Sequence, residues 1–178
     1  MPNLSRIKRL VYPALAFLSL FACTFGFDPD TPGGGTPGGS IPDGESATVV
    51  KIIDGDTIDV NLNGQTVRIR YIGVNTPESD EVCYREATQA NRLLVESKTV
   101  RLVADAEDTD RYGRLLRYIY AGDLFVNAAL VQQGYAEVVS YPPNTARYEE
   151  LKKLEIEAAG ARRGCHPTGI FDDGSYTR

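Results

Sequence analysis

The chain has 178 residues, which is long enough for one domain with appended segments. Hydrophobic residues make up 42% and charged residues 24%, so the composition is that of a globular protein. The net charge of −5 argues against binding nucleic acid by bulk charge, because affinity for a polyanion comes largely from Lys and Arg on phosphates. Any activity on nucleic acid must therefore depend on a local basic site, helped by a bound cation.

Residues 1–23 are typical of an export signal. Three basic residues precede an apolar run of about 13 residues, which is shorter than the roughly 20 that a membrane-spanning helix needs. The run ends in Leu20-Phe21-Ala22-Cys23, which resembles the lipobox of bacterial lipoproteins, where the cysteine is lipidated and begins the mature chain. We therefore expect a lipoprotein anchored to the membrane at Cys23, on the extracytoplasmic side. The alternative is an ordinary signal peptide and a secreted chain.

Residues 24–46 are predicted to form a flexible linker. The stretch over residues 31–40 is rich in Gly and Pro and has no apolar periodicity. A tether directly after a lipid anchor would lift the following domain, predicted over residues 47–166, off the membrane. Residues 167–178 are predicted to be a C-terminal tail.

The domain is predicted to begin with a three-strand meander. A β-prone run over residues 49–53 stops at Asp54-Gly55. Residues 57–62 alternate apolar and polar side chains, which indicates a strand with one buried face. Asn63-Gly64 is a strong hairpin signal, because both residues tolerate a positive φ. Residues 65–74 then predict one long strand.

Helices and strands follow in mixed order in the second part of the domain. The predicted elements are a helix over 81–97, a strand over 99–103, a charged loop over 105–113, a strand over 115–120, a helix over 126–133 that ends at Gly134, an extended stretch over 135–141, and a last helix up to residue 161. We expect Asn144 or Thr145 to cap the last helix, with Leu151, Leu154 and Ala158 facing inward. The order predicts an α+β fold, a five-stranded barrel of the oligonucleotide-binding (OB) type with three helices.

The sequence excludes several kinds of active site. His166 is the sole histidine, so Ser-His-Asp or Cys-His catalysis is not expected, and there is no P-loop, HExxH or glycine-rich dinucleotide motif. Cys83 and Cys165 remain as a pair, which in an exported protein is a candidate disulfide. The alternative for these two cysteines is a pair of buried free thiols.

Three short polar segments carry the candidate chemistry. The segments are Asp54-Gly55-Asp56-Thr57, Asn75-Thr76-Pro77-Glu78 and Asp110-Arg111-Tyr112-Gly113-Arg114. Each alone is also explained as a turn or a solvated loop. Together they offer side-chain oxygens of Asp56 and Asn75 to one cation, of the kind that Ca²⁺ prefers. Arg70 and Arg114 add planar groups that match phosphate oxygens.

These segments, in this order, resemble the staphylococcal (micrococcal) nuclease family, also called thermonucleases. The resemblance covers about residues 47–164. Besides the three segments, it includes Tyr118-Ile119-Tyr120 and the stretch from Val126 to Gly134. It implies an OB-type barrel that hydrolyses DNA and RNA with Ca²⁺ and leaves 3′-phosphate ends. We expect such a chain to act as a monomer.

The resemblance also implies a role for individual residues. Asp56 matches the family's first metal carboxylate, and Thr76 matches the residue whose main-chain carbonyl ligates the metal. Glu78 matches the acid assigned as general base. Arg70 and Arg114 match the two arginines that bind the phosphate. Tyr112 matches a tyrosine that contacts a nucleotide phosphate, and Tyr141 matches an aromatic residue that packs on a base.

One departure from the family pattern concerns the metal site. Asn75 stands where the best-known members have a second metal carboxylate, so we expect it to ligate Ca²⁺ through its amide oxygen and to weaken metal binding. The alternatives to an active nuclease are a catalytically weak or inactive nucleic-acid-binding barrel and a Ca²⁺-binding or adhesion lipoprotein. The presence of Arg70, Glu78 and Arg114 favours the enzyme.

Overall fold

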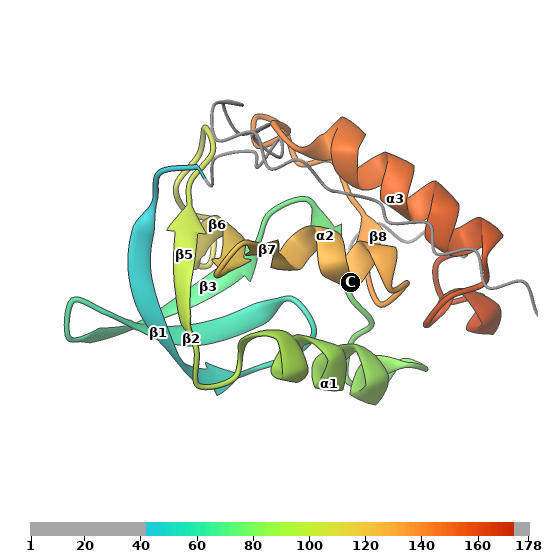
Figure 1. Ribbon diagram of the computed structural model, residues 1–178, viewed down its shortest axis with the longest axis horizontal. Coiled ribbons are helices and arrows are strands. Elements are labelled where there is room, and N and C mark those ends of the chain that lie inside the picture. The colour runs from blue at the N-terminus through green and yellow to red at the C-terminus, as the bar shows by residue number, and fades with distance from the viewer. Residues whose placement is uncertain (1–41, 173–178) are drawn as a thin grey trace, which may run out of the picture. The chain divides into compact units, whose positions relative to one another are not determined.

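The computed structural model describes residues 42–172, in which strands wrap around a core and three helices flank them (Figure 1). The strands are β1 (Glu45–Ile52), β2 (Thr57–Leu62), β3 (Gln65–Tyr71), β4 (Val74–Asn75), β5 (Thr99–Val103), β6 (Leu115–Ala121), β7 (Leu124–Phe125) and β8 (Glu137–Val138). The helices are α1 (Tyr84–Val95), α2 (Val126–Gln132) and α3 (Tyr148–Gly160), followed by the short 3₁₀ helix η1 (His166–Thr168). The predicted export signal, Cys23 and most of the predicted linker lie outside the described residues.

Five strands close into the barrel that the sequence predicts. Strand β1 pairs antiparallel with both β2 and β5, β2 pairs with β3, and β5 pairs with β6. A parallel pairing of β3 with β6 closes the ring. Closure removes the exposed edges of these strands. The expectation of a five-stranded α+β barrel with three helices is therefore confirmed. Among the described residues, no helix has the length and apolar character needed to cross a membrane.

The first two turns of the barrel follow directly from local sequence. Asn63 and Gly64 have φ values of 52° and 85° and connect β2 to β3 in a two-residue hairpin. In β1 the register shifts between Val49 and Lys51, which marks a bulge. The extra residue allows both Val49 and Ile52 to face the core, where they are 4% and 8% exposed.

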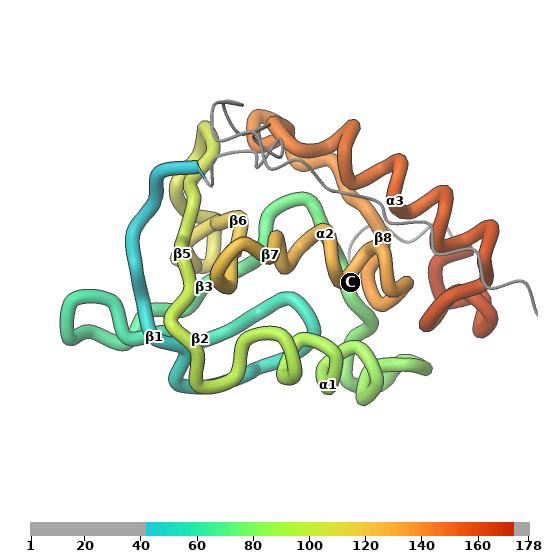
Figure 2. The backbone as a smooth tube through the Cα atoms, viewed as in Figure 1, coloured from blue at the N-terminus to red at the C-terminus, as the bar shows by residue number. Residues whose placement is uncertain are grey.

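The predicted long strand over residues 65–74 is wrong, because the chain leaves the barrel after β3. Gly73 has a φ of 76°, and the chain turns there before it forms β4. Strand β4 pairs with β8, with Val74 opposite Val138, instead of continuing the barrel. The backbone trace in Figure 2 runs from β3 past β8 toward α1. Sequence periodicity cannot reveal this exchange of partners, because β8 lies about 60 residues later.

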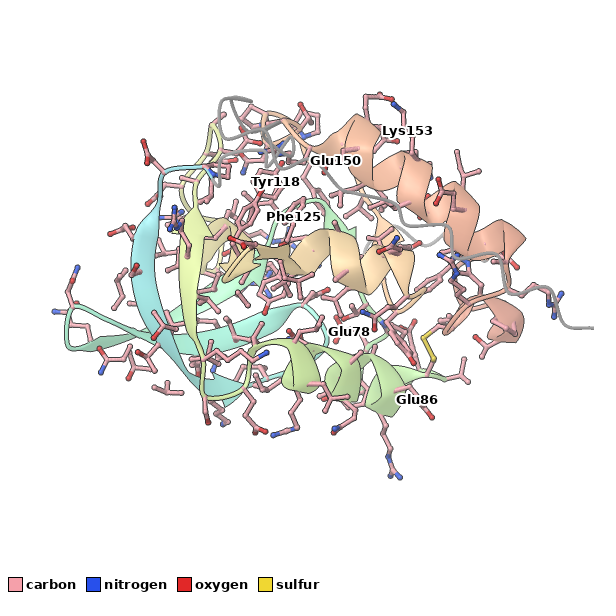
Figure 3. The ribbon with its side chains drawn as sticks, viewed as in Figure 1. Glu78, Glu86, Tyr118, Phe125, Glu150 and Lys153 are labelled. Atoms are coloured by element: carbon pink, nitrogen blue, oxygen red, sulfur yellow. A yellow bond between two sulfur atoms is a disulfide. The ribbon has the colours of Figure 1, made fainter. Side chains whose placement is uncertain are left out.

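The three helices pack beside the barrel, with α2 between α1 and α3 in the view of Figure 1. Leu130 of α2 and Leu151 of α3 are fully buried in the main core. A smaller cluster holds Tyr118 and Phe125, which are labelled in Figure 3 and meet edge to face with ring centroids 5.9 Å apart. The inward face predicted for α3 is confirmed, since Leu151 and Ala158 are buried and Leu154 is partly buried against the core.

The predicted cap of α3 is wrong. The helix begins at Tyr148 and its N-cap residue is Arg147, so neither Asn144 nor Thr145 caps it. The buried side chain of Asn144 instead binds the backbone of Glu107 in the charged loop. Its Oδ1 accepts a hydrogen bond from the Glu107 N–H at 2.7 Å, and its Nδ2 donates to the Glu107 carbonyl at 3.1 Å. Asn144 therefore joins the segment before α3 to the loop that precedes β6.

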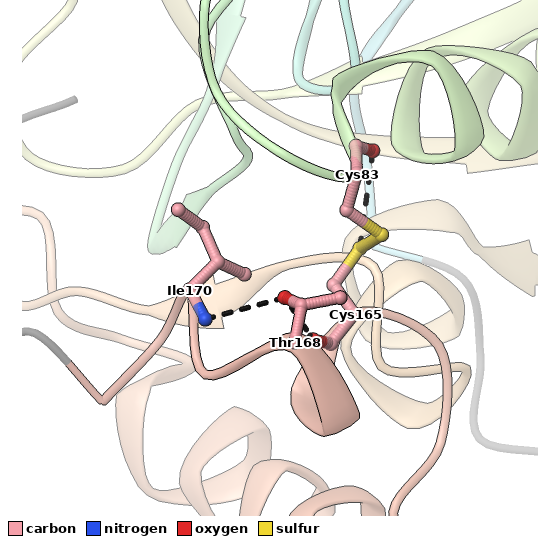
Figure 4. Close-up of a disulfide and its surroundings, with 4 residues drawn as sticks. All are labelled: Cys83, Cys165, Thr168 and Ile170. Carbon is pink, nitrogen blue, oxygen red and sulfur yellow. Dashed lines mark hydrogen bonds between the residues drawn. A yellow bond between two sulfur atoms is a disulfide. The ribbon is translucent and has the colours of Figure 1, made fainter.

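Cys83 and Cys165 form a disulfide, drawn in Figure 4. Their Cα atoms are 5.7 Å apart and their sequence separation is 82. Cys83 is the N-cap residue of α1, and Cys165 directly precedes η1. Next to the disulfide, the hydroxyl of Thr168 in η1 donates a hydrogen bond to the Cys165 carbonyl at 2.7 Å. The bond therefore fixes the C-terminal segment to the start of α1.

Candidate active site

The turn between β1 and β2 places Asp56 against the segment that follows β4. The Asp56 N–H donates to Asp54 Oδ1 at 3.0 Å, which is a local arrangement typical of Asp in turns. Gly55 lies so close to Thr76 that a Cβ atom at position 55 would be 2.6 Å from Thr76 Oγ1. The glycine is thus required for close approach of the two segments.

Asp56 and Thr76 are joined by two hydrogen bonds. The Thr76 N–H donates to Asp56 Oδ2 at 2.8 Å, and the Thr76 hydroxyl donates to the same oxygen at 3.1 Å. The other carboxylate oxygen of Asp56, Oδ1, accepts from the Thr57 hydroxyl at 3.1 Å. The three residues are each no more than 4% exposed, so the carboxylate has a fixed orientation.

Arg70 connects Asp56 to Asn75. Its Nη2 lies 3.2 Å from Asp56 Oδ2 and donates to Asn75 Oδ1 at 3.0 Å. Its Nη1 donates to the carbonyl oxygens of Tyr71 and Val74 at 2.8 and 2.7 Å, so the guanidinium also braces the turn after β3. One arginine therefore holds two oxygen-bearing side chains and the backbone between them in a single cluster.

Two further acids lie close to this cluster. Burial, followed by repulsion from Asp56, raises the pKa of Asp54 to about 6. Burial and the charge of Asp56 also raise the pKa of Glu78 above its ordinary value, while Arg70 opposes that rise. Glu78 is labelled in Figure 3 and belongs to the connection between β4 and α1. The structure thus brings together Asp56, Arg70, Asn75 and Thr76, with Glu78 within electrostatic reach.

A second group forms in the loop before β6, around Asp110. Asp110 Oδ1 accepts from the N–H groups of Tyr112 and Arg114, at 2.9 and 3.0 Å, and Oδ2 accepts from Arg114 Nε at 2.6 Å. Burial alone would raise the pKa of Asp110, but these hydrogen bonds with Arg114 and Tyr112 hold it below its usual value. Arg111 and Arg114 both lie over the ring of Tyr112, at 4.8 and 5.4 Å from its centroid.

The barrel pairing sets this second group beside strand β3. Arg70 is the register partner of Leu116 across the parallel β3–β6 pairing, and Arg114 precedes Leu116 by two residues. Tyr112, Gly113 and Arg114 line a groove of about 440 Å³ together with side chains of the β2–β3 hairpin. Arg68 and Asp59 form an ion pair there, at 2.8 Å. The groove is open and polar, which suits an extended, charged ligand.

Tyr141 belongs to the segment that precedes α3. It is 45% exposed and lies in the turn before α3, where it forms an isolated bridge with Asn144. A separate hollow of about 350 Å³ lies between α1 and the residues that follow α2, and it includes Leu93 and Gln133. None of the predicted site residues lines that hollow.

Comparison with known proteins decides the family. The model of a family described as "Staphylococcal nuclease homologue" matches residues 68–165, which is more than half of the chain. The chain belongs to the staphylococcal nuclease family. The match includes Arg70, Asn75, Glu78 and Arg114, and it begins after Asp56.

Several similar proteins are named as nucleases. The chain is 39% identical over 121 residues to a thermonuclease of Staphylococcus intermedius, a match that covers 65% of this chain and 72% of the relative. It is 38% identical over 119 residues to the SPbeta prophage-derived endonuclease YokF of Bacillus subtilis, covering 62% of this chain and 40% of the relative. It is 37% identical over 121 residues to the endonuclease YncB of the same species, covering 64% and 57%. The chain thus spans less than two thirds of the two Bacillus proteins.

Membership of the family implies a metal cofactor, and the donor atoms near Asp56 are compatible with one. Asp56 contributes a carboxylate, Asn75 an amide oxygen, and Thr76 a main-chain carbonyl, all of which are hard oxygen donors. Within residues 42–172, no three His, Cys, Asp or Glu side chains form a metal-binding group.

Two residues that structure the site have no role assigned from the sequence. Asp110 belongs to a segment that the sequence predicts to be functional, and the structure shows that it holds Arg114 in place. Glu137 accepts a hydrogen bond from Asn75 Nδ2 at 3.0 Å and is 3% exposed. The sequence feature that could have pointed to Glu137 is its position as a single acid between Ala136 and Val138, in an extended and otherwise apolar stretch. Its partner is 62 residues away, so sequence alone does not reveal the contact.

Proposed function

We propose that this chain is a Ca²⁺-dependent phosphodiesterase that hydrolyses DNA and RNA and leaves 3′-phosphate ends. Family membership and the relatives named thermonuclease and endonuclease support a nuclease. The observation that carries the proposal is the Asp56–Arg70–Asn75–Thr76 cluster, in which oxygen donors for a cation adjoin a buried guanidinium that matches phosphate.

The residues of the cluster divide the work of phosphate hydrolysis. Asp56, Asn75 and the Thr76 carbonyl would hold Ca²⁺, which neutralises phosphate charge and orients the attacking water. Glu78 accepts a proton from that water as general base. Arg70 and Arg114 donate hydrogen bonds to the phosphoryl oxygens, where negative charge develops.

The remaining residues position the nucleic acid. The Tyr112 hydroxyl contacts a neighbouring phosphate from the loop that Asp110 organises, and the exposed ring of Tyr141 packs on a base. The arginines beside Tyr112 supply the local positive charge that an acidic chain needs to bind a polyanion.

We further propose that the chain acts outside the cytoplasm as a monomer, attached to the membrane by a lipid on Cys23. The lipobox-like end of the export signal supports this location. Metabolic labelling with a radioactive fatty acid tests it. Label on the wild-type chain and none on a Cys23→Ser variant is the expected result, and equal labelling of both would contradict it.

The activity is tested with heat-denatured DNA and with RNA across a series of divalent cations. We expect cleavage with Ca²⁺, loss of cleavage with a chelator, and product ends that a 3′-phosphatase can dephosphorylate. Cleavage that a chelator leaves unchanged would contradict the metal dependence. Binding of DNA with no cleavage under any of the cations would favour the alternative, a catalytically inactive nucleic-acid-binding barrel.

A further inference from the structure

Glu137 lies directly opposite Asn75 in the short β4–β8 ladder. The two residues are register partners across the antiparallel pair, and they are 3% and 1% exposed. Asn75 Nδ2 donates a hydrogen bond to Glu137 Oε1 at 3.0 Å. The Glu137 carboxyl group therefore holds the nitrogen end of the Asn75 amide inside the protein.

The contacts of the Asn75 amide distinguish its two ends. Oδ1 accepts a hydrogen bond from Arg70 Nη2 at 3.0 Å, and the same nitrogen lies 3.2 Å from Asp56 Oδ2. Oδ1 therefore faces the cluster around Asp56, and Nδ2 faces Glu137. A flipped amide would place its N–H₂ group against the guanidinium of Arg70 and its oxygen against the carboxyl oxygen of Glu137. Both contacts would then lose their hydrogen bond, because donor would meet donor and acceptor would meet acceptor.

We infer that Glu137 is a positioning residue for the metal site, which keeps the amide oxygen of Asn75 directed toward the cation. The inference rests on the proposed function, since that function assigns a cation to Asp56, Asn75 and Thr76. Only the oxygen of an amide ligates a hard cation such as Ca²⁺. Glu137 thus acts on the metal through Asn75, as outer carboxylates do at other metal sites.

The same contact changes what an Asn75→Asp substitution should do. A carboxylate at position 75 restores the charge expected from the family, but it faces the buried carboxyl group of Glu137. Two negatively charged groups in contact repel each other. Asn75→Asp alone should therefore fail to tighten Ca²⁺ binding. Adding Glu137→Gln supplies an N–H donor to the new carboxylate and should remove the conflict.

The test compares the full-length wild type with E137L, E137Q, N75D and N75D/E137Q. Ca²⁺ dissociation constants come from calorimetry, and the rise of the unfolding midpoint with Ca²⁺ gives a second readout that needs no catalysis. We expect E137L to bind Ca²⁺ roughly ten-fold or more weakly, as for other outer-sphere substitutions. E137Q keeps an oxygen acceptor for Asn75 Nδ2 and should stay close to wild type. The double variant should bind at least about ten-fold more tightly than N75D.

A matched control separates positioning from the stability of β8. Glu155 accepts a hydrogen bond from the Val138 N–H at 2.7 Å and so anchors the same strand from α3, without a described contact to Asn75. E155L should destabilise the fold yet leave the Ca²⁺ dissociation constant unchanged. If E137L does not fold, the comparison of N75D with N75D/E137Q decides.

Two outcomes would overturn the inference. One is Ca²⁺ binding by E137L equal to that of wild type, and the other is a double variant that binds no more tightly than N75D. Either result is compatible with an active nuclease. Conversely, Ca²⁺ binding that depends on Glu137, in a chain that cleaves neither DNA nor RNA, would uphold the inference and overturn the proposed function.

Discussion

Arg70 and Arg114 have the same proposed task but different surroundings. The Arg70 side chain is 11% exposed and contacts Asp56, Asn75 and two backbone carbonyls. The Arg114 side chain is 30% exposed and is paired with Asp110 alone among its described acidic contacts. Removal of Arg70 takes one donor away from each of four buried acceptors, whereas removal of Arg114 exposes its partner to water. The two arginines should therefore be separable by stability.

We predict that Arg70→Ala and Arg114→Ala each lower kcat/KM at least about 100-fold, the scale of a lost transition-state donor. Arg70→Ala should also lower the free energy of unfolding by about 3 kcal/mol, as expected when one partner of a buried ion pair is removed. Arg114→Ala should lower it by less than about 1 kcal/mol. Urea unfolding and initial cleavage rates measure the two effects. An Arg114→Ala variant that cuts as fast as wild type would show that the site is wrongly assigned.

At the same scale, the sequence predicts which residues come together better than how they are held. Asp56, Asn75 and Thr76 meet in space as their order along the chain suggests. The second role of Arg70, which is to brace the turn after β3, is not visible in the sequence, because its acceptors are backbone carbonyls. Glu137 is missed for a related reason, since its partner Asn75 lies 62 residues away in the sequence.

At the scale of the elements, local patterns predict what local physics determines. The Asn63-Gly64 hairpin requires only two positive φ values, and the alternation in β2 requires only one buried face. The end of β3 and the pairing of β4 with β8 depend on a contact between distant segments, so period-2 alternation extends the strand too far. The prediction that Asn144 caps α3 is wrong because its side chain forms tertiary hydrogen bonds with the backbone of Glu107.

The hydrogen bonds between Asn144 and Glu107 predict that the contact between the segment before α3 and the loop before β6 stabilises the fold. Asn144→Ala removes the two hydrogen bonds that the buried Asn144 side chain makes with the Glu107 backbone, so the free energy of unfolding should fall by about 1–3 kcal/mol. Thr145→Ala is the matched control, because Thr145 is exposed and is the alternative cap residue. It should change stability by less than about 0.5 kcal/mol. Equal losses for both variants, measured by urea unfolding, would favour a capping role for this segment.

At the scale of the whole described domain, the disulfide joins two segments that are 82 residues apart in the sequence. Cys83 begins α1, close to the connection that carries Glu78, and Cys165 ends the family match just after α3. The Cys165 N–H also donates to the Gly134 carbonyl at 2.8 Å, and a Cβ atom at Gly134 would lie 2.4 Å from the Arg163 carbonyl oxygen. The C-terminal segment is thus packed tightly against the end of α2 as well as bonded to α1.

The disulfide should stabilise the fold without tuning the chemistry. Its loop of 82 residues corresponds to about 4.5 kcal/mol of unfolded-state entropy, so the double variant Cys83→Ser/Cys165→Ser should unfold at a clearly lower urea concentration. Asp56, Arg70 and Asn75 make no described contact with either cysteine, so the cleavage rate well below the unfolding midpoint should stay within about twofold of wild type. Wild type treated with a thiol reductant is the control and should match the variant. A rate that falls in parallel with stability would instead mean that the bond holds Glu78 and the start of α1 in the catalytic arrangement.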